Sequence, residues 1–391
     1  MFKRMVCALS LLVVFALGAR AQDAKPDYDA TIEGDTPETM KIKIVANKPA
    51  DQTSAKATVE TYNRLLGFIG DLFFYEEYRE FKEKAEVIGE KVERGVCGKL
   101  ITETCLDEMT ALKKKQDGER KEKEAADIKD GMKPRRRIPA KVKGESVEGA
   151  YTVIEVEEGS EYSLKNREGK WETKSTLNQL RFYCAAKEGV WQIDRVEKFA
   201  ADYSGKPDKE GKYPQVWKEE KVMAGMLGFF ARPLPKVAAL PEIDTPEKLA
   251  RAAITWLGEA RRASTDGLAQ SLYSQVVDLF NPLFSERNLK DGMAEAEKRS
   301  AEEATRRDQE AKEHTERRIS VKEVESGWQA TIAARSKWSP EIVLTIVKTD
   351  QGLRIAKAAL RRMETKYDDK GNATEVEKID PFNSPSQFDW N

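Results

Sequence analysis

Helix-like and strand-like patterns each appear twice along the chain. After Ser54, an expected N-cap, apolar residues recur every three or four positions as far as Phe73, which predicts an amphipathic helix. A second helical stretch, roughly 99–129, becomes steadily more charged. From 138 to 199 the pattern changes to short alternating runs separated by glycines, which is typical of an antiparallel sheet.

The same order returns after a proline-rich segment. A short apolar helix is expected over 216–230, and three prolines between 233 and 241 then indicate a stiff linker. Thr245 is expected to cap a new helix, because a proline follows it at the first helical position. A highly charged helix is predicted over 290–316, and strands return between 319 and 363.

Two segments of the predicted strands resemble each other. Residues 180–193 (LRFYCAAKEGVWQI) align without a gap with residues 342–355 (IVLTIVKTDQGLRI), 162 positions later. The expected helix caps Ser54 and Thr245 are 191 positions apart. The repeat predicts two copies of one domain. The first copy is longer by 29 residues, which we expect to lie in the region that carries two cysteines, Cys97 among them.

These patterns predict an α+β fold in which N-terminal helices pack on a curved antiparallel sheet, twice in tandem. The predicted organisation is a signal peptide at 1–21, an extended segment at 22–53, a first domain at 54–203, a linker with a short helix at 204–244, a second domain at 245–367 and a loose tail at 368–391.

The N-terminus has the features of an export signal. Lys3 and Arg4 precede an apolar run over 5–17, and an Ala-Arg-Ala motif ends at Ala21. This pattern predicts cleavage before Gln22 and a periplasmic or secreted protein. A retained N-terminal anchor is the alternative. No later segment is apolar enough to predict a membrane span.

The charge balance is close to neutral. The chain has 67 basic and 68 acidic residues; without Lys3, Arg4 and Arg20, 64 basic residues remain, which gives a mature net charge of −4. This argues against nucleic acid as a partner. The basic triplets at 113–115 and 135–137 have acidic neighbours, so we interpret them as solvated surface.

Three cysteines would remain after export. An oxidising compartment permits one disulfide among Cys97, Cys105 and Cys184. Cys97 and Cys105 would be about 12 Å apart on one straight helix, but Gly95 and Gly98 could bend the chain and bring them together. We favour that pair, and we expect Cys184 to be a buried core thiol.

No catalytic, metal-binding or cofactor-binding motif is evident. His314, the only histidine, lies in a charged helical run and is expected at the surface. Aromatic residues in the predicted helices and strands are candidates for lining a ligand site, with ordinary core packing as the alternative. These candidates are Trp171, Tyr183, Trp191, Trp256, Trp328 and Trp338.

A short motif accompanies this arrangement of helices and strands. The closing strand of the first copy begins Gly189-Val190-Trp191-Gln192-Ile193, and the second copy has a less faithful version at 352–355. The chain resembles the nuclear transport factor 2-like superfamily, also called SnoaL-like or cystatin-like in fold. That resemblance implies two tandem cone-like domains with helices on the concave face of each sheet. It also implies either a small-molecule enzyme that uses the cone cavity or a non-catalytic binding domain.

Taken together, the sequence predicts an exported, non-enzymatic binding or interaction module of the cell envelope. Its partner would be a small molecule or an envelope protein. The alternative is a small-molecule lyase or isomerase that uses Asp and Tyr acid–base chemistry in a cone cavity.

Overall fold

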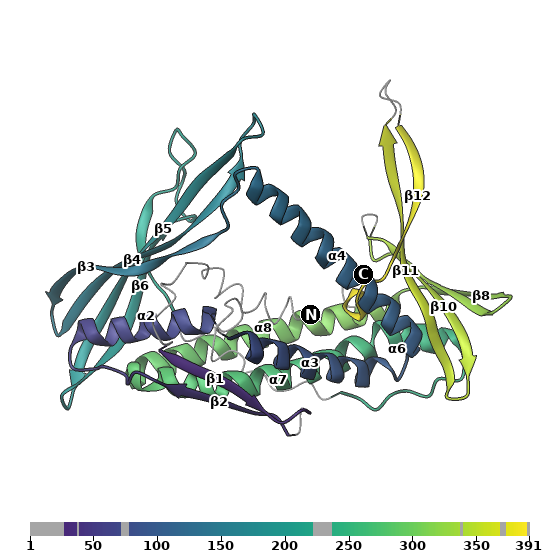
Figure 1. Ribbon diagram of the computed structural model, residues 1–391, viewed down its shortest axis with the longest axis horizontal. Coiled ribbons are helices and arrows are strands. Elements are labelled where there is room, and N and C mark those ends of the chain that lie inside the picture. The colour runs from purple at the N-terminus through teal and green to yellow at the C-terminus, as the bar shows by residue number, and fades with distance from the viewer. Residues whose placement is uncertain are drawn as a thin grey trace. The chain divides into compact units, whose positions relative to one another are not determined.

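The computed structural model describes residues 27–36, 39–71, 78–221, 237–336, 339–367 and 373–388. The expected signal segment with its cleavage site at Ala21 and Gln22 lies outside these ranges, as do Trp338 and most of the expected helix over 216–230. The described chain is α+β, with helices and antiparallel sheets, as the sequence predicts (Figure 1).

The helices and strands divide between the two halves of the chain. Those of the first half are β1 Tyr28–Glu33, β2 Lys41–Ala46, α2 Ala55–Asp71, α3 Arg79–Cys97, α4 Glu103–Lys129, β3 Arg136–Glu148, β4 Tyr151–Lys165, β5 Trp171–Lys187, β6 Val190–Ala201 and β7 Gln215–Glu219. Those of the second half are α6 Pro246–Ile254, α7 Trp256–Phe280, the 3₁₀ turn η2 Asn281–Leu283, α8 Glu286–Glu316, β8 Ile319–Val324, β9 Gly327–Ile332, β10 Glu341–Thr349, β11 Gly352–Tyr367, β12 Ala373–Pro381 and η3 Pro385–Phe388.

The first helix described in each repeat begins at the residue that follows its predicted cap. The Ser54 hydroxyl accepts a hydrogen bond from the amide of Ala57 at 3.1 Å, and α2 starts directly after it. The Thr245 hydroxyl likewise accepts from the amide of Lys248 at 3.2 Å at the start of α6. Each cap satisfies a backbone donor that the helix leaves unpaired.

Both five-stranded sheets are antiparallel meanders with the same topology. Their strand orders are β3-β4-β5-β6-β7 and β8-β9-β10-β11-β12. Cys184 pairs with Ile193 in the first sheet, and Ile346 pairs with Ile355 in the second, 162 positions later in each case. Both pairings directly follow a register shift. The two repeated segments therefore share their register, including a β-bulge.

Two segments differ from the expectation. Residues 215–219 form the edge strand β7, not the start of a helix, and Trp217 packs on the ring of Phe199 at 5.1 Å. The expected loose tail contains β12, which pairs with β11, and the chain then buries Phe382 and Phe388. In both places the local sequence pattern does not determine the secondary structure, and contacts with a sheet or a core do.

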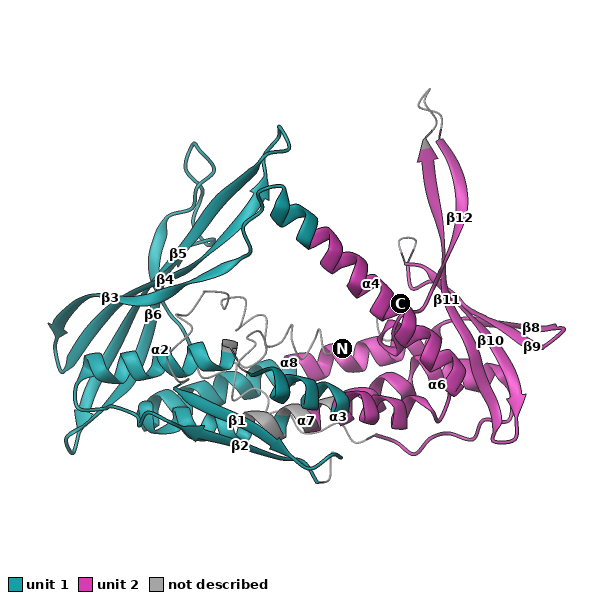
Figure 2. Ribbon diagram, in the orientation of Figure 1, with its two compact units in different colours: residues 1–88, 125–233, 268–301 teal, residues 89–124, 234–267, 302–391 magenta. Residues whose placement is uncertain are grey.

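The chain forms two compact units, each made of three separate segments (Figure 2). Unit 1 contains residues 1–88, 125–233 and 268–301, and unit 2 contains residues 89–124, 234–267 and 302–391. Each unit thus combines the sheet of one repeat with helical segments of the other. A consecutive tandem arrangement is not confirmed.

The same backbone contact secures the exchanged segment in each unit. In unit 1, Ile193 forms a parallel bridge to Phe284, and the amide of Ser285 donates to the Ile193 carbonyl at 3.0 Å. In unit 2, Ile355 forms a parallel bridge to Ile101, and the amide of Thr102 donates to the Ile355 carbonyl at 2.9 Å. Equivalent isoleucines of the two sheets therefore each bind the turn before a long helix that belongs to the other repeat.

Each of these turns also contributes to a hydrophobic core. In unit 1, the buried ring of Tyr62 lies 5.4 Å from Phe182, 5.6 Å from Phe280 and 5.7 Å from Phe284. Burial raises the pKa of Tyr62 well above its ordinary value. In unit 2, Leu100 and Ile101 of the turn are buried in a cluster with residues of β10 and β11. Aromatic and aliphatic side chains thus fill the space between helix and sheet.

The extra length of the first repeat is divided between two places. The two copies are 191 positions apart at Ser54 and Thr245, 183 apart at Glu103 and Glu286, and 162 apart at the closing strands. The first difference, of 8 residues, lies before Glu103 in the stretch that contains Cys97, and the second, of 21 residues, lies after it. The larger one reflects longer strands, because β3, β4 and β5 have 13, 15 and 17 residues whereas β8, β9 and β10 have 6, 6 and 9.

We expect Leu100→Ala to destabilise the sheet of unit 2 and Leu283→Ala to destabilise the sheet of unit 1. Each change leaves a cavity in the core of the unit to which the side chain belongs, at a cost of about 2–5 kcal/mol. Hydrogen exchange should become faster in β10 and β11 for Leu100→Ala, and in β5 and β6 for Leu283→Ala. The two variants are controls for each other, and faster exchange in the opposite sheets would contradict the exchanged arrangement.

Candidate functional site

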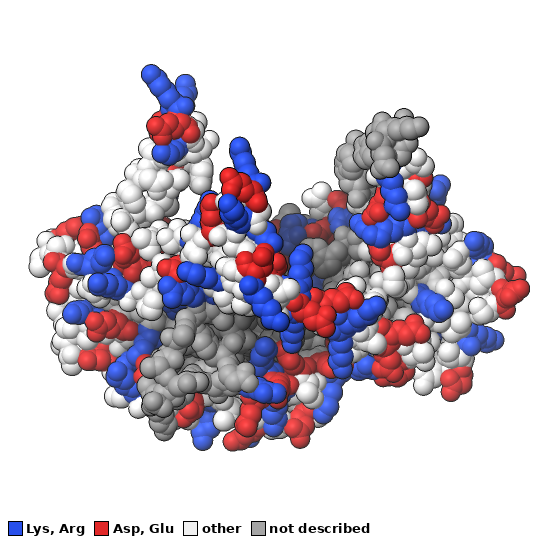
Figure 3. All heavy atoms as spheres, turned by 45° about the horizontal axis from the view of Figure 1, so that its top comes forward, with Lys and Arg blue, Asp and Glu red and all other residues white. Residues whose placement is uncertain are grey.

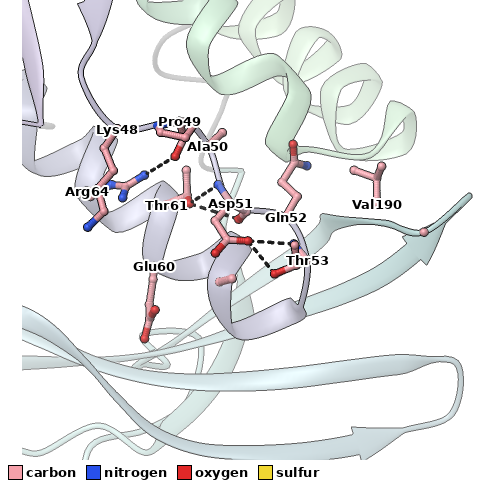
Figure 4. Close-up of a pocket in the computed structure, with 12 residues that line it drawn as sticks. Lys48, Pro49, Ala50, Asp51, Gln52, Thr53, Glu60, Thr61, Arg64 and Val190 are labelled. Atoms are coloured by element: carbon pink, nitrogen blue, oxygen red, sulfur yellow. Dashed lines mark hydrogen bonds between the residues drawn. The ribbon is translucent and has the colours of Figure 1, made fainter.

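A pocket of 790 Å³ opens in unit 1 beside the first turns of α2 (Figure 4). The loop before the helix, the helix itself and the turn between β5 and β6 form its walls. Its lining residues are Lys48, Pro49, Ala50, Asp51, Gln52, Thr53, Ala57, Glu60, Thr61, Arg64, Gly189 and Val190. Its volume lies within the range of small-molecule sites, which is about 300–1,000 Å³.

Hydrogen bonds to the helix hold the loop that forms one wall. The amide of Asp51 donates to the Thr61 hydroxyl at 3.1 Å, and that hydroxyl donates to the Asp51 carbonyl at 3.2 Å. One Arg64 nitrogen, Nη2, donates to the Pro49 carbonyl at 3.1 Å. The Asp51 carboxylate accepts from the amide of Thr53 at 3.0 Å and from its hydroxyl at 2.7 Å, and these bonds lower the pKa of Asp51.

Gln52 ties this loop to the opposite wall. Its side-chain amide donates to the backbone carbonyls of Trp191 at 2.9 Å and Pro282 at 2.8 Å. Its backbone carbonyl accepts from the backbone amide of Trp191 at 3.1 Å. The adjacent turn at Glu188 and Gly189 has φ values of 54° and 83°. Positive φ at two successive residues is the geometry of a tight type I′ hairpin, which brings Val190 to the pocket.

The pocket presents charges of both signs. Lys48 and Arg64 lie on one side of the pocket, and Gln52 and Val190 lie on the other (Figure 4). Glu60 adds an exposed carboxylate. Mixed charge is also the pattern of the wider surface, because basic and acidic side chains intermingle over the face drawn in Figure 3.

The predicted aromatic residues do not gather at this pocket, whose lining contains no tryptophan or tyrosine. In unit 1, Trp191 is half-buried and packs against the core beside the pocket, and Trp171 donates through Nε1 to Asp130 at 3.2 Å. In unit 2, Trp256 is buried and donates to the Ala238 carbonyl at 2.9 Å, and Trp328 packs against the core. Their role in binding stays a prediction.

A partly buried carboxylate joins the start of α8 to the sheet of unit 1. Asp194 is the extra residue of the β-bulge, between Ile193 and the next paired residue. Its carboxylate accepts hydrogen bonds from Ser285 at 2.6 Å, from Tyr151 at 3.0 Å and from Arg287 at 3.1 Å. Three donors therefore already surround this carboxylate. Sequence patterns did not identify it, because one extra residue in a strand leaves no local signal.

Tyr183 forms a second tyrosine–carboxylate pair. Its hydroxyl donates to Glu197 at 3.0 Å, and the guanidinium of Arg195 lies 3.8 Å above its ring. Burial raises the pKa of Tyr183, and the neighbouring Glu197 carboxylate raises it further. A tyrosine in this state is a poor proton donor at neutral pH.

All three cysteines of the described chain are buried thiols. Burial raises the pKa of Cys105 to about 11 and that of Cys184 to about 12, so neither is a reactive thiolate at neutral pH. Cys184 lies in the core of unit 1. Cys97 ends α3, and Cys105 lies in the first turn of α4 within the same core cluster of unit 2. Their pairing stays a prediction.

If Cys97 and Cys105 pair on export, protein purified from an oxidising compartment will show one thiol when it is denatured. The same sample after reduction should show three, which is the matched control. A count of three before reduction would contradict the pairing. The measurement is thiol titration with a chromogenic disulfide.

His314 is buried, with 5% of its surface exposed, so the expected surface position is wrong. It lies in the last turn of α8 in unit 2. Burial lowers its pKa to about 4, and the nearby Arg335, Arg317 and Arg262 act in the same direction, whereas Glu310 opposes them. The imidazole is therefore neutral at pH 7.

A periodic signal for this burial exists, but it consists of charged residues. Apart from Ala311, the more buried positions along the end of α8 and the residue after it are Glu303, Arg307, Glu310, His314 and Arg317. They recur every three or four residues, as the inner face of a helix does. A search for apolar positions passes over such a stripe.

We expect stability to fall between pH 6.5 and pH 4 because of His314. The unfolded chain takes up a proton near pH 6.5 while the folded chain resists until about pH 4, so the stabilisation is complete above pH 6.5 and lost as the pH falls. The loss amounts to about 2–3 kcal/mol. Urea unfolding of His314→Gln should show a shallower decline than wild type over this range, whereas Lys312→Gln, at an exposed site on the same turn, should not. Parallel curves for wild type and His314→Gln would contradict this account.

Within the described residues, no group of histidine, cysteine and acidic side chains is arranged to hold a metal ion, and no helix combines the length and apolarity needed to cross a membrane. Comparisons with protein-family models, with the sequences of characterised proteins and with solved structures gave no match.

Proposed function

We propose that this chain is an exported, non-enzymatic binding module of the cell envelope, with units of the nuclear transport factor 2-like kind. In this proposal the pocket of unit 1 takes a ligand with both charged and apolar parts, either a small molecule or a segment of an envelope protein. The observation that carries the proposal is the hydrogen bonding of the pocket's polar groups. Asp51, Thr53 and Thr61 hydrogen-bond to one another or to the wall, which suits a preformed binding surface.

The alternative, a lyase or isomerase, requires a carboxylate and a tyrosine that face an open cavity. The two tyrosine–carboxylate pairs of unit 1 weigh against it, because Asp194 already accepts three hydrogen bonds and Tyr183 is held by Glu197 and Arg195. The aromatic core between α2 and the sheet, centred on Tyr62, also fills the space that a cone-cavity enzyme would use. The export signal rests on the sequence pattern alone.

Native mass spectrometry of the protein purified from its own envelope tests this proposal. We expect a chain that begins at Gln22 with a retained ligand or partner. Ala50→Trp should abolish this retention, because the indole would fill the pocket, whereas Ala126→Trp places the same side chain on an exposed face of α4 and should leave it unchanged. The proposal would be contradicted if the protein turned over a small molecule and Ala50→Trp did not reduce that turnover. Equal retention of the ligand or partner by the two variants would also contradict it.

A further inference from the structure

Arg317 is a buried cation whose outer nitrogens have no hydrogen-bond acceptor. It directly follows α8 in unit 2, and 6% of its surface is exposed. Its Nε donates to the Ala333 carbonyl at 2.7 Å, which fixes the direction of the guanidinium. Nη1 and Nη2 are both buried, and neither has a hydrogen-bond partner in the described structure.

The charges that act on Arg317 have its own sign. Arg251 lies on α6 and donates to the carbonyls of His314 at 3.0 Å, Thr315 at 2.8 Å and Arg317 at 2.7 Å. Burial lowers the pKa of Arg317 to about 10, and Arg335 and Arg251 contribute to this shift. The guanidinium therefore remains charged at neutral pH, and the charges acting on it are repulsive.

Two carboxylates in the last turns of α8 are already paired with other arginines. Glu313 forms an ion pair with Arg335 at 2.5 Å, and Glu310 forms one with Arg306 at 2.8 Å. An unpaired buried charge costs several kcal/mol, so proteins seldom retain one without a counter-ion. A guanidinium that offers two parallel N–H groups fits the two oxygens of a carboxylate or phosphate group.

We propose that Arg317 is the centre of a binding site for a small oxyanion, a phosphate or carboxylate group whose two oxygens accept from Nη1 and Nη2. Arg335, a quarter of whose side chain is exposed, adds positive charge that acts on Arg317. His314 contributes a neutral ring whose Nδ1 is also buried without a partner. The site belongs to unit 2 and does not depend on the function proposed for the pocket of unit 1.

Thermal unfolding of the mature full-length chain in chloride, phosphate and acetate at constant ionic strength tests this site. Phosphate or acetate should raise the midpoint above its value in chloride by about 5 °C near saturation. The anion that gives the larger shift identifies the ligand chemistry. Arg317→Met should lose the shift, whereas Arg318→Met, at the adjacent exposed position, should keep it.

No shift with either anion in wild type would overturn the proposal, as would equal shifts in the wild type and Arg317→Met. If Arg317→Met does not fold, phosphorus NMR of inorganic phosphate with the wild type replaces it. Line broadening that Arg335→Met weakens several-fold and Arg318→Met does not would support the site, and its absence would refute it. Ala50→Trp should leave every anion response unchanged, so this result is separable from the test of the pocket.

Discussion

The structure of each unit depends on a short contact between its sheet and a turn from the other half of the chain. Ile193 and Ile355, at equivalent points of the two sheets, each form a parallel bridge to such a turn. Phe284 and Ile101, the residues bridged, are almost fully buried in the two cores. Backbone hydrogen bonds and core packing therefore act at the same residues, and the long helices α8 and α4 begin directly after them. The position of the loop and helix around the pocket follows from this frame.

Much of the fold could be predicted from the sequence because its signals are local. Each signal lies within a short stretch of the chain. Helices begin after the caps at Ser54 and Thr245, and the alternating, repeated segments form paired strands. The exchange of helical segments could not be predicted, since an amphipathic face shows that a helix needs a partner without showing which sheet supplies it. Trp217 shows the same limit on a smaller scale, because pairing with β6 and packing on Phe199 place residues 215–219 in an edge strand.

The candidate sites were harder to predict than the fold. The pocket comes from a loop whose shape depends on individual hydrogen bonds, and its lining from Lys48 to Thr53 has no periodic pattern. The aromatic residues were candidates because their side chains are large. Large aromatic side chains line ligand sites and also fill hydrophobic cores, so size alone does not distinguish the two. At the end of α8 the buried face is made of charged residues, so burial and polarity point in opposite directions at His314 and Arg317. Contacts between distant segments, such as Arg251 with the last carbonyls of α8, decide the outcome there.

The three-segment composition of each unit also constrains when the chain can fold. Unit 1 requires residues as late as 301, and unit 2 requires residues as early as 89. During synthesis, the first sheet is complete in sequence at Glu219, but its core lacks Phe280 and Phe284 until some sixty further residues have been added. The contacts that complete both units span large sequence separations, which slows folding. Until then, the first sheet lacks part of its core packing, and the apolar surface left uncovered favours association with other chains.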